Sequence, residues 1–222
     1  MYVIEYFETR LEMDKIFEEM KKYKIVPVIV IDDAEDAKDL ADALCEGGIP
    51  VAEVTFRTEA AEETIRRMSS RHPDMLVGAG TVLTKEQVDR AADAGAKFIV
   101  TPGLNPEIVR YCQERNVPVC PGVATPSEVE KAMSLGLDLV KFFPAEPLGG
   151  IKMLKAISAV YSNVYFMPTG GINGENISDY LAMDRVAACG GSWMVKKDLI
   201  KTGEFDQIRN KVRELAETLV RS

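Results

Sequence analysis

The segment LVKFFPAE (residues 139–146) has the composition of a buried β-strand, except for one residue. Its apolar run is interrupted by Lys141, and a buried lysine without a partner is energetically costly. Either the ammonium group of Lys141 reaches the surface, or the amine is needed in the interior. The segment therefore predicts a buried strand and, on it, a candidate functional residue.

Similar apolar runs recur along the chain at nearly regular intervals. Their starts are roughly 19 to 26 residues apart, which is the length of a strand, a helix and two short loops. The predicted strands are residues 26–31, 51–56, 75–79, 97–101, 117–121, 138–143, 164–168 and 186–189. Eight such units favour an α/β fold of the compact (β/α)8 type, a TIM barrel. The alternative is an open, doubly wound parallel sheet.

Helix signals lie between these runs. Thr84 followed by Gln87 predicts a capping box, and the segments NPEIV (105–109) and TPSEV (125–129) each place a capping residue before a proline. Residues 9–22 have the apolar spacing of an extra amphipathic helix before the first strand. No linker or low-complexity segment interrupts the pattern, so we expect one domain over residues 1–222.

Composition narrows the class of protein. The chain has 222 residues, of which 46% are hydrophobic and 28% charged, and a formal net charge of −8. This profile is that of a soluble globular protein, and the negative charge argues against nucleic acid or an anionic membrane as partner. The N-terminal residues MYVIEYFETRLEMDK lack the pattern of a secretory signal, and the four cysteines contain no CxxC pair. We therefore expect a cytoplasmic protein with free thiols.

A second charged residue raises the same question as Lys141. Glu53 stands between two apolar residues of the predicted strand 51–56, and shares its side of that strand with Thr55 and Arg57. A buried acid and a buried amine on two strands of one barrel can share an interior site. The alternative is an ion pair that only satisfies itself. His72 is the only histidine, predicted at the surface, which excludes a serine–histidine triad and metal sites built from several imidazoles.

Glycine-rich segments follow several of the predicted strands. PTGGIN (168–173) and CGGSW (189–193) come after the last two, which is where barrels of this type commonly bind phosphate, and Ser192 adds a hydroxyl. In GAGTVL (78–83), Thr81 offers a hydroxyl at a strand end, and in TPGLNP (101–106), Pro102 can line a pocket. Each of these segments can also be read as a simple turn.

Taken together, these motifs resemble those of the 2-keto-3-deoxy-6-phosphogluconate (KDPG) / 4-hydroxy-2-oxoglutarate (KHG) aldolase family. The likeness runs from about residue 25 to the C-terminus, with the motifs in matching order and spacing. It implies a homotrimeric (β/α)8 barrel and a class I aldolase that needs no metal and no cofactor. The motifs that carry it are EVTFRT (53–58), GAGTVL (78–83), TPG (101–103), VKFFPAE (140–146), PTGG (168–171) and GGSW (190–193).

The resemblance also implies residue roles. Lys141 matches the lysine that forms a Schiff base, and Glu53 matches the general acid/base. The matching residues that hold substrate are Arg57 and Thr81 for the pyruvate carboxylate, Pro102 and Phe143 for the pocket wall, and Gly170, Gly171, Gly191 and Ser192 for phosphate.

The implied reaction is cleavage of KDPG to pyruvate and glyceraldehyde 3-phosphate, with cleavage of KHG to pyruvate and glyoxylate as a second activity. The partner is then a small anionic substrate, a phosphorylated keto-deoxy sugar acid or pyruvate. The alternatives are the galactonate epimer of the same sugar acid, an isomerase or epimerase in which Lys141 acts only by its charge, and a barrel without catalytic activity.

Overall fold

The computed structural model describes residues 15–221. Within this range the strands are β1 (Ile25–Ile29), β2 (Val51–Thr55), β3 (Leu76–Gly80), β4 (Phe98–Val100), β5 (Val119–Cys120), β6 (Gly122–Val123), β7 (Leu139–Phe142), β8 (Tyr165–Pro168) and β9 (Cys189–Gly191). The helices are residues 15–23, α2 (Ala37–Glu46), α3 (Ala61–Arg71), α4 (Lys85–Asp93), α5 (Pro106–Glu114), α6 (Pro126–Ser134), α7 (Gly150–Ser158), α8 (Ile177–Leu181), α9 (Lys197–Lys201) and α10 (Phe205–Arg221). Every predicted strand segment contains strand residues, and residues 9–14 of the predicted N-terminal helix lie outside the described range.

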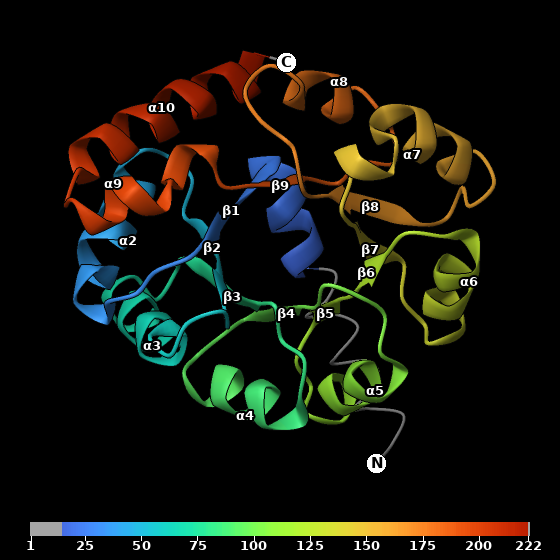
Figure 1. The fold of residues 1–222 in the computed structure, drawn as a ribbon, viewed down its shortest axis with the longest axis horizontal. Helices are drawn as coiled ribbons and strands as arrows, with labels where there is room; N and C mark the ends of the chain where they lie inside the picture. Colours follow the sequence, from blue (N-terminus) through green and yellow to red (C-terminus); the bar gives the residue numbers. More distant parts are fainter. Residues whose placement is uncertain (1–14, 222) are drawn as a thin grey trace.

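The expected closed barrel of eight strands is wrong. Among the described residues, hydrogen bonding joins the strands into a six-stranded parallel sheet with the order β5-β4-β3-β2-β1-β9, and a separate three-stranded sheet with the order β6-β7-β8. Figure 1 shows the strands of both sheets around a common interior, with most helices on the outside and the blue helix 15–23 in the middle of the view. Helices and strands alternate as the spacing predicts, but the hydrogen-bonded ladder is not continuous.

The two interruptions have different causes. Pro121, the last residue of the predicted strand 117–121, separates β5 from β6, because proline has no N–H to donate to a neighbouring strand. The chain before it pairs with β4, and the chain after it pairs with β7. On the other side, β8 meets the last segment only through isolated bridges, Phe166 to Val186 and Thr169 to Gly190. The two sheets are therefore adjacent at two places, but the hydrogen bonds between their strands do not form one continuous sheet.

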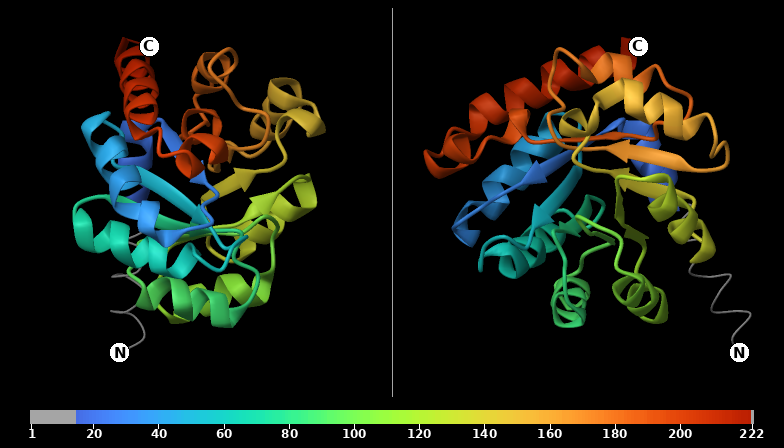
Figure 2. Two further views of the ribbon diagram at one scale, coloured as in Figure 1. Left: turned by 60° about the vertical axis from the view of Figure 1, so that its left-hand side comes forward. Right: turned by 45° about the vertical axis from the view of Figure 1, so that its right-hand side comes forward.

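The predicted caps position the outer helices. The Thr84 hydroxyl accepts a hydrogen bond from the Gln87 N–H at 3.2 Å, but the Gln87 side chain accepts from Leu83, so the reciprocal half of the box is absent. The complete capping box lies at Thr125 and Glu128, at the start of α6. One continuous apolar core fills the space between helices and strands, and the two further views show helices covering the outer faces (Figure 2).

Lys24 links the two ends of the described chain. Its φ of +62° is in the left-handed region, and its ammonium group donates a hydrogen bond of 2.8 Å to the Leu219 carbonyl near the end of α10. The Lys24 carbonyl accepts from the Cys189 N–H at 2.9 Å, so the same residue also fixes the start of β9 beside β1. A cation at the C-terminal end of a helix is favourable because it faces unpaired carbonyl groups.

Two expectations from composition can be compared with the fold. All four cysteines are free thiols, as predicted. Burial raises the pKa of Cys112 and of Cys120 to about 12, so both thiols stay protonated. Within residues 15–221, none of the helices has the length and apolar character needed to cross a bilayer.

Candidate active site

The two charged residues singled out in the sequence meet in the interior. Nζ of Lys141 lies 3.2 Å from Oε1 of Glu53, although the residues are 88 positions apart. Lys141 comes from β7 in the smaller sheet and Glu53 from β2 in the larger one. Both are buried, with exposed fractions of 5% and 0%. The two side chains therefore meet in the interior, and their joint role in a reaction stays a prediction.

One carboxylate oxygen of this pair lacks a hydrogen-bond partner among the described residues. Among the described residues, Oε2 of Glu53 is buried without a hydrogen-bond partner, a situation that costs free energy unless another molecule supplies a donor. The Lys141 ammonium group lies 5.2 Å from the centroid of the Phe143 ring, a cation–π arrangement. The site thus presents an amine and a free carboxylate oxygen against an aromatic wall.

The predicted carboxylate and wall residues lie at the ends of adjacent strands. Arg57 is exposed, two residues beyond β2, and Thr81 directly follows β3. Pro102 is half-buried, two residues beyond β4. These strands are neighbours in the larger sheet, so the three residues line one edge of it. Within residues 15–221, no hydrogen bond joins their side chains to Lys141 or Glu53.

Thr81 has an unfavourable backbone conformation. Its φ is +57°, which is uncommon for a β-branched residue and costs on the order of 1–3 kcal/mol. The next residue, Val82, donates a hydrogen bond of 3.3 Å to the Val100 carbonyl, which helps to hold the turn. Strain of this kind concentrates at functional sites, which supports a role for the Thr81 hydroxyl.

The predicted phosphate loop after β8 has donors available. Gly170 and Gly171 have φ values of +98° and +85°, a region that favours glycine. Among the described residues, their N–H groups have no acceptor, whereas their carbonyl oxygens accept hydrogen bonds from Glu146 and from the Asn176 amide. Unpaired N–H groups on a glycine turn are suited to an anion.

Gly190 and Gly191, at the end of β9, lie directly against neighbouring side chains. A Cβ on Gly191 would lie 1.9 Å from the Trp193 ring, so this glycine makes room for the indole. Ser192 is exposed beside it. Likewise, a Cβ on Gly190 would lie 2.2 Å from Oγ1 of Thr169. The glycines of GGSW therefore accommodate neighbouring side chains.

Thr169 is a polar residue of this region that the sequence analysis did not single out. Its side chain is buried, and its hydroxyl donates a long hydrogen bond of 3.4 Å to the Met167 carbonyl. The available signal was its place in PTGG, directly before the two glycines.

His72, expected at the surface, is half-buried and lies 2.6 Å from the Asp42 carboxylate.

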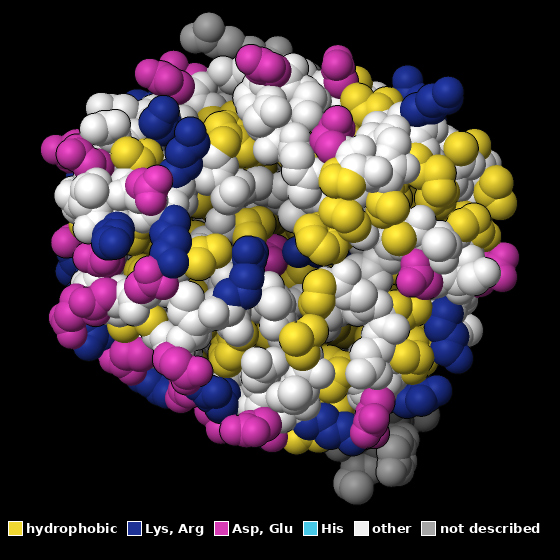
Figure 3. Space-filling view, in the orientation of Figure 1, with side chains coloured by type: hydrophobic (Ala, Val, Ile, Leu, Met, Phe, Trp, Pro, Cys, Tyr) yellow, Lys and Arg dark blue, Asp and Glu magenta, His cyan; other side chains and the backbone are white. Residues whose placement is uncertain are grey.

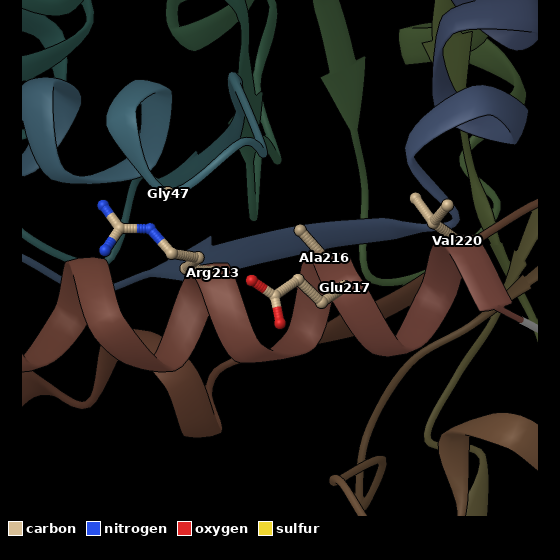
Figure 4. Close-up of a pocket in the computed structure, with 5 residues that line it drawn as sticks. All are labelled: Gly47, Arg213, Ala216, Glu217 and Val220. Carbon is tan, nitrogen blue, oxygen red and sulfur yellow. The ribbon is translucent and has the colours of Figure 1, made fainter.

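The face in Figure 3 is hollowed near its centre, and hydrophobic, basic and acidic side chains meet around the hollow. A distinct pocket of about 310 Å³ lies on the outside, between α10 and the end of α2 (Figure 4). It is lined by Gly47, Arg213, Ala216, Glu217 and Val220. None of these is a predicted site residue or a partner of the Lys141–Glu53 pair, so the interior pair stays the candidate site.

Comparison with known proteins places this geometry in a family. The family described as "Aldolase: KDPG and KHG aldolase" matches residues 16–211. A 2-dehydro-3-deoxy-phosphogluconate aldolase of Haemophilus influenzae is 51% identical over 205 residues, covering 92% of this chain and 97% of that protein.

Two solved structures have the same fold. KDPG aldolase from Legionella pneumophila, with pyruvate captured at low pH as a covalent carbinolamine intermediate, has a TM-score of 0.86 at 42% identity, covering 90% of this chain and 96% of that one. The Zymomonas mobilis KDPG aldolase with 3-phosphoglycerate has a TM-score of 0.84 at 38% identity, covering 92% and 94%. The match of sequence and fold over nearly the whole chain shows that this protein belongs to the KDPG and KHG aldolase family.

Proposed function

We propose that this protein is a class I aldolase that cleaves KDPG to pyruvate and glyceraldehyde 3-phosphate. The observation that carries the proposal is the buried contact of 3.2 Å between Lys141 and Glu53, in a chain of this family. The covalent pyruvate adduct of the Legionella relative supports the same chemistry. Cleavage of KHG to pyruvate and glyoxylate is the second activity, because its pyruvate half is the same.

Lys141 begins the reaction as a nucleophile. Glu53 is close enough to take a proton from the ammonium group, which frees the nitrogen lone pair to attack the C2 carbonyl carbon. Glu53 then gives this proton to the departing hydroxyl of the resulting carbinolamine, which leaves as water. A protonated imine forms, and Glu53 is a carboxylate again. This iminium group withdraws electrons from the adjacent carbon–carbon bond, which a free ketone does less effectively.

Glu53 then moves the protons. As the C3–C4 bond breaks, its carboxylate removes the proton of the C4 hydroxyl, and the aldehyde product forms. The bonding electrons pass to C3 and produce an enamine on Lys141. Glu53 returns the proton to C3, and water hydrolyses the imine to release pyruvate. The buried, unpartnered Oε2 is suited to hold the substrate hydroxyl or a bridging water.

Neighbouring residues hold the substrate. Arg57 supplies a planar fork of donors for the carboxylate, and the Thr81 hydroxyl adds a further donor. Pro102 and Phe143 form the wall, and the ring of Phe143 lies against the Lys141 amine. The unpaired N–H groups of the PTGG turn, with Ser192, hold the phosphate; the 3-phosphoglycerate of the Zymomonas relative supports a phosphorylated ligand.

Borohydride trapping tests the proposal directly. Incubation with pyruvate and borohydride should add one reduced pyruvate to the chain, located on Lys141 by peptide mass analysis. Lys141→Arg should abolish both the adduct and cleavage, whereas Lys155→Arg, at an exposed site on α7, should change neither. An isomerase or epimerase would give no adduct, and a trapped adduct on another lysine would overturn the assignment.

For the organisation of the protein we propose one domain over residues 1–222 that assembles as a homotrimer in the cytoplasm. The family resemblance supports this assembly, and the free thiols suit a reducing compartment. Light scattering coupled to gel filtration should give about three times the 24.5 kDa chain mass, and a monomeric mass would overturn the proposed trimer.

A further inference from the structure

Glu146 and Tyr180 form a contact that the proposed reaction does not use. Glu146 ends the KFFPAE segment, and Tyr180 lies on α8. The Tyr180 hydroxyl donates a short hydrogen bond to Oε1 of Glu146. The tyrosine is fully buried, and burial raises the pKa of its hydroxyl far above neutrality. The hydroxyl is therefore protonated and acts as the donor.

The same glutamate packs on the PTGG turn. A Cβ on Gly171 would lie 2.6 Å from both Cβ and Cγ of Glu146, so the stem of the glutamate lies directly against this glycine. The Glu146 N–H donates to the Gly170 carbonyl at 3.0 Å, and the Ala145 N–H donates to the Thr169 carbonyl at 2.8 Å. The backbone and stem of Glu146 therefore fix the turn that carries the unpaired N–H groups.

The carboxylate of Glu146 lies against the start of α7. A Cβ on Gly150 would lie 2.8 Å from Oε1 of Glu146 and 3.1 Å from the Tyr180 hydroxyl, which places both atoms against the start of α7. Glu146 is exposed as a residue, so solvent-facing rotamers are open to it. A carboxylate released from Tyr180 beside the Gly171 turn would repel a bound phosphate.

We propose that Glu146 and Tyr180 are a positioning pair that sets selectivity for phosphorylated substrates. Glu146 shapes the Gly170–Gly171 turn with its stem, and Tyr180 keeps the carboxylate of Glu146 turned away from the phosphate. This proposal rests on the proposed function, because it assumes that the turn binds the substrate phosphate. Neither residue contacts the reacting atoms.

A double-mutant cycle tests this division of roles. Tyr180→Phe keeps the ring and releases the carboxylate, so KM for KDPG should rise about tenfold, the equivalent of about 1.4 kcal/mol, with kcat unchanged. KM for the phosphate-free KHG should stay within about twofold. Glu146→Gln keeps the stem and removes the charge, so in that background Tyr180→Phe should change KM for KDPG by less than about twofold.

Matched variants separate this effect from general damage. Tyr161→Phe removes a tyrosine–glutamate hydrogen bond of 3.0 Å between the loop after α7 and Glu130 of α6, and should leave the kinetics of both substrates unchanged. Glu146→Ala removes the stem as well, and should raise KM for KDPG in the presence of Tyr180. Inorganic phosphate, as a competitive inhibitor, should bind more weakly to Tyr180→Phe than to the unchanged protein.

Three outcomes would overturn the proposal. The first is an equal rise of KM for both substrates, which would mean that the pair supports the whole site. The second is a Tyr180→Phe effect that persists in the Glu146→Gln background. The third is wild-type kinetics for Tyr180→Phe. Pyruvate trapping on each variant distinguishes these from failure of the proposed function, since unchanged protein without an adduct would indicate that the aldolase assignment itself is wrong.

Discussion

Gly80 leaves the space that the carboxylate of Glu53 occupies: a Cβ built on Gly80 would lie 2.2 Å from Oε1 and 2.6 Å from Cγ. Both residues belong to the larger sheet, on the adjacent strands β2 and β3. Gly80 belongs to the GAGTVL segment, and in the structure it accommodates the acid that meets Lys141.

We therefore expect Gly80→Ala to displace the Glu53 carboxylate from Lys141. A shift of about 1 Å at a reacting group can cost on the order of 10² in rate, so kcat should fall by about that factor while the fold is retained. Gly103→Ala is the control, because nothing lies within 4 Å of its added Cβ. Steady-state kinetics and circular dichroism would measure the two effects, and wild-type kcat in Gly80→Ala would contradict the argument.

Glu53→Gln should separate imine formation from proton transfer. The amide keeps the shape of the side chain but removes the base, a role worth roughly 10²–10⁴ in rate. Borohydride trapping of pyruvate should survive, whereas KDPG cleavage and deuterium exchange into the methyl group of pyruvate should collapse. Normal exchange in this variant would show that another group carries the protons.

Ser192→Ala should weaken binding of the phosphate alone. A hydrogen bond to a charged group contributes about 1.5–3 kcal/mol, so KM for KDPG should rise about tenfold or more while KHG kinetics stay unchanged. Gly191→Val is a poorer test, because its side chain would displace the Trp193 ring. Ser178→Ala, at an exposed position of α8, is a suitable control. An equal loss on both substrates would argue against a phosphate role.

Thr58 should position Arg57, the residue before it in the chain. Its hydroxyl donates a hydrogen bond of 2.5 Å to the Ile31 carbonyl, which fixes the turn after β2. Thr58→Val removes the donor, at a cost of about 1 kcal/mol, and should raise KM for both KDPG and KHG about fivefold, with little change in kcat. Thr58→Ser should restore the wild-type values, and a loss confined to kcat would contradict the assignment.

Asp42 should contribute a pH-dependent part of the stability. The hydrogen bonds from Arg71, at 3.0 and 2.9 Å, and the contact with His72 lower the pKa of Asp42 from 3.8 to about 2. Because the folded pKa lies below the unfolded one, the stabilisation is complete above about pH 4 and is lost as the pH falls towards 2.

Asp42→Asn should therefore lower the free energy of unfolding by about 1 kcal/mol at neutral pH, after allowance for solvent screening. The difference from wild type should shrink between pH 4 and pH 2, as measured by urea unfolding. Asp39→Asn, at an exposed position of the same helix, is the control. A difference that stays constant over this range would rule out the proposed linkage.

Several of these features could be predicted from the sequence because they depend on local patterns. Every predicted apolar run contains strand residues, although β6 lies outside these runs, and the placement of Lys141 and Glu53 within such runs predicted a shared interior site. The division into two sheets was missed, because apolar periodicity does not report whether neighbouring strands keep their hydrogen bonds. The break lies at Pro121, between β5 and β6. The missing N–H of this proline was the available signal.

Other features depend on contacts between distant residues. The contact between Glu146 and Tyr180 joins positions 34 residues apart, and no spacing rule predicts it. Gly191 was interpreted as a place where backbone approaches an anion, which stays a prediction, and the Trp193 ring beside it was not foreseen. A glycine in a sequence indicates that space is needed, without identifying the group that fills it.

The two side chains that we propose to react belong to different sheets, Glu53 to the larger and Lys141 to the smaller. Neither half of the chain can therefore hold the pair alone, and catalytic competence becomes a measure of complete tertiary assembly. During refolding, the ability to trap pyruvate should return only when the two sheets have docked, later than the backbone signal of the separate halves. The recovery of enzymatic activity therefore reports the last step in the folding of this protein.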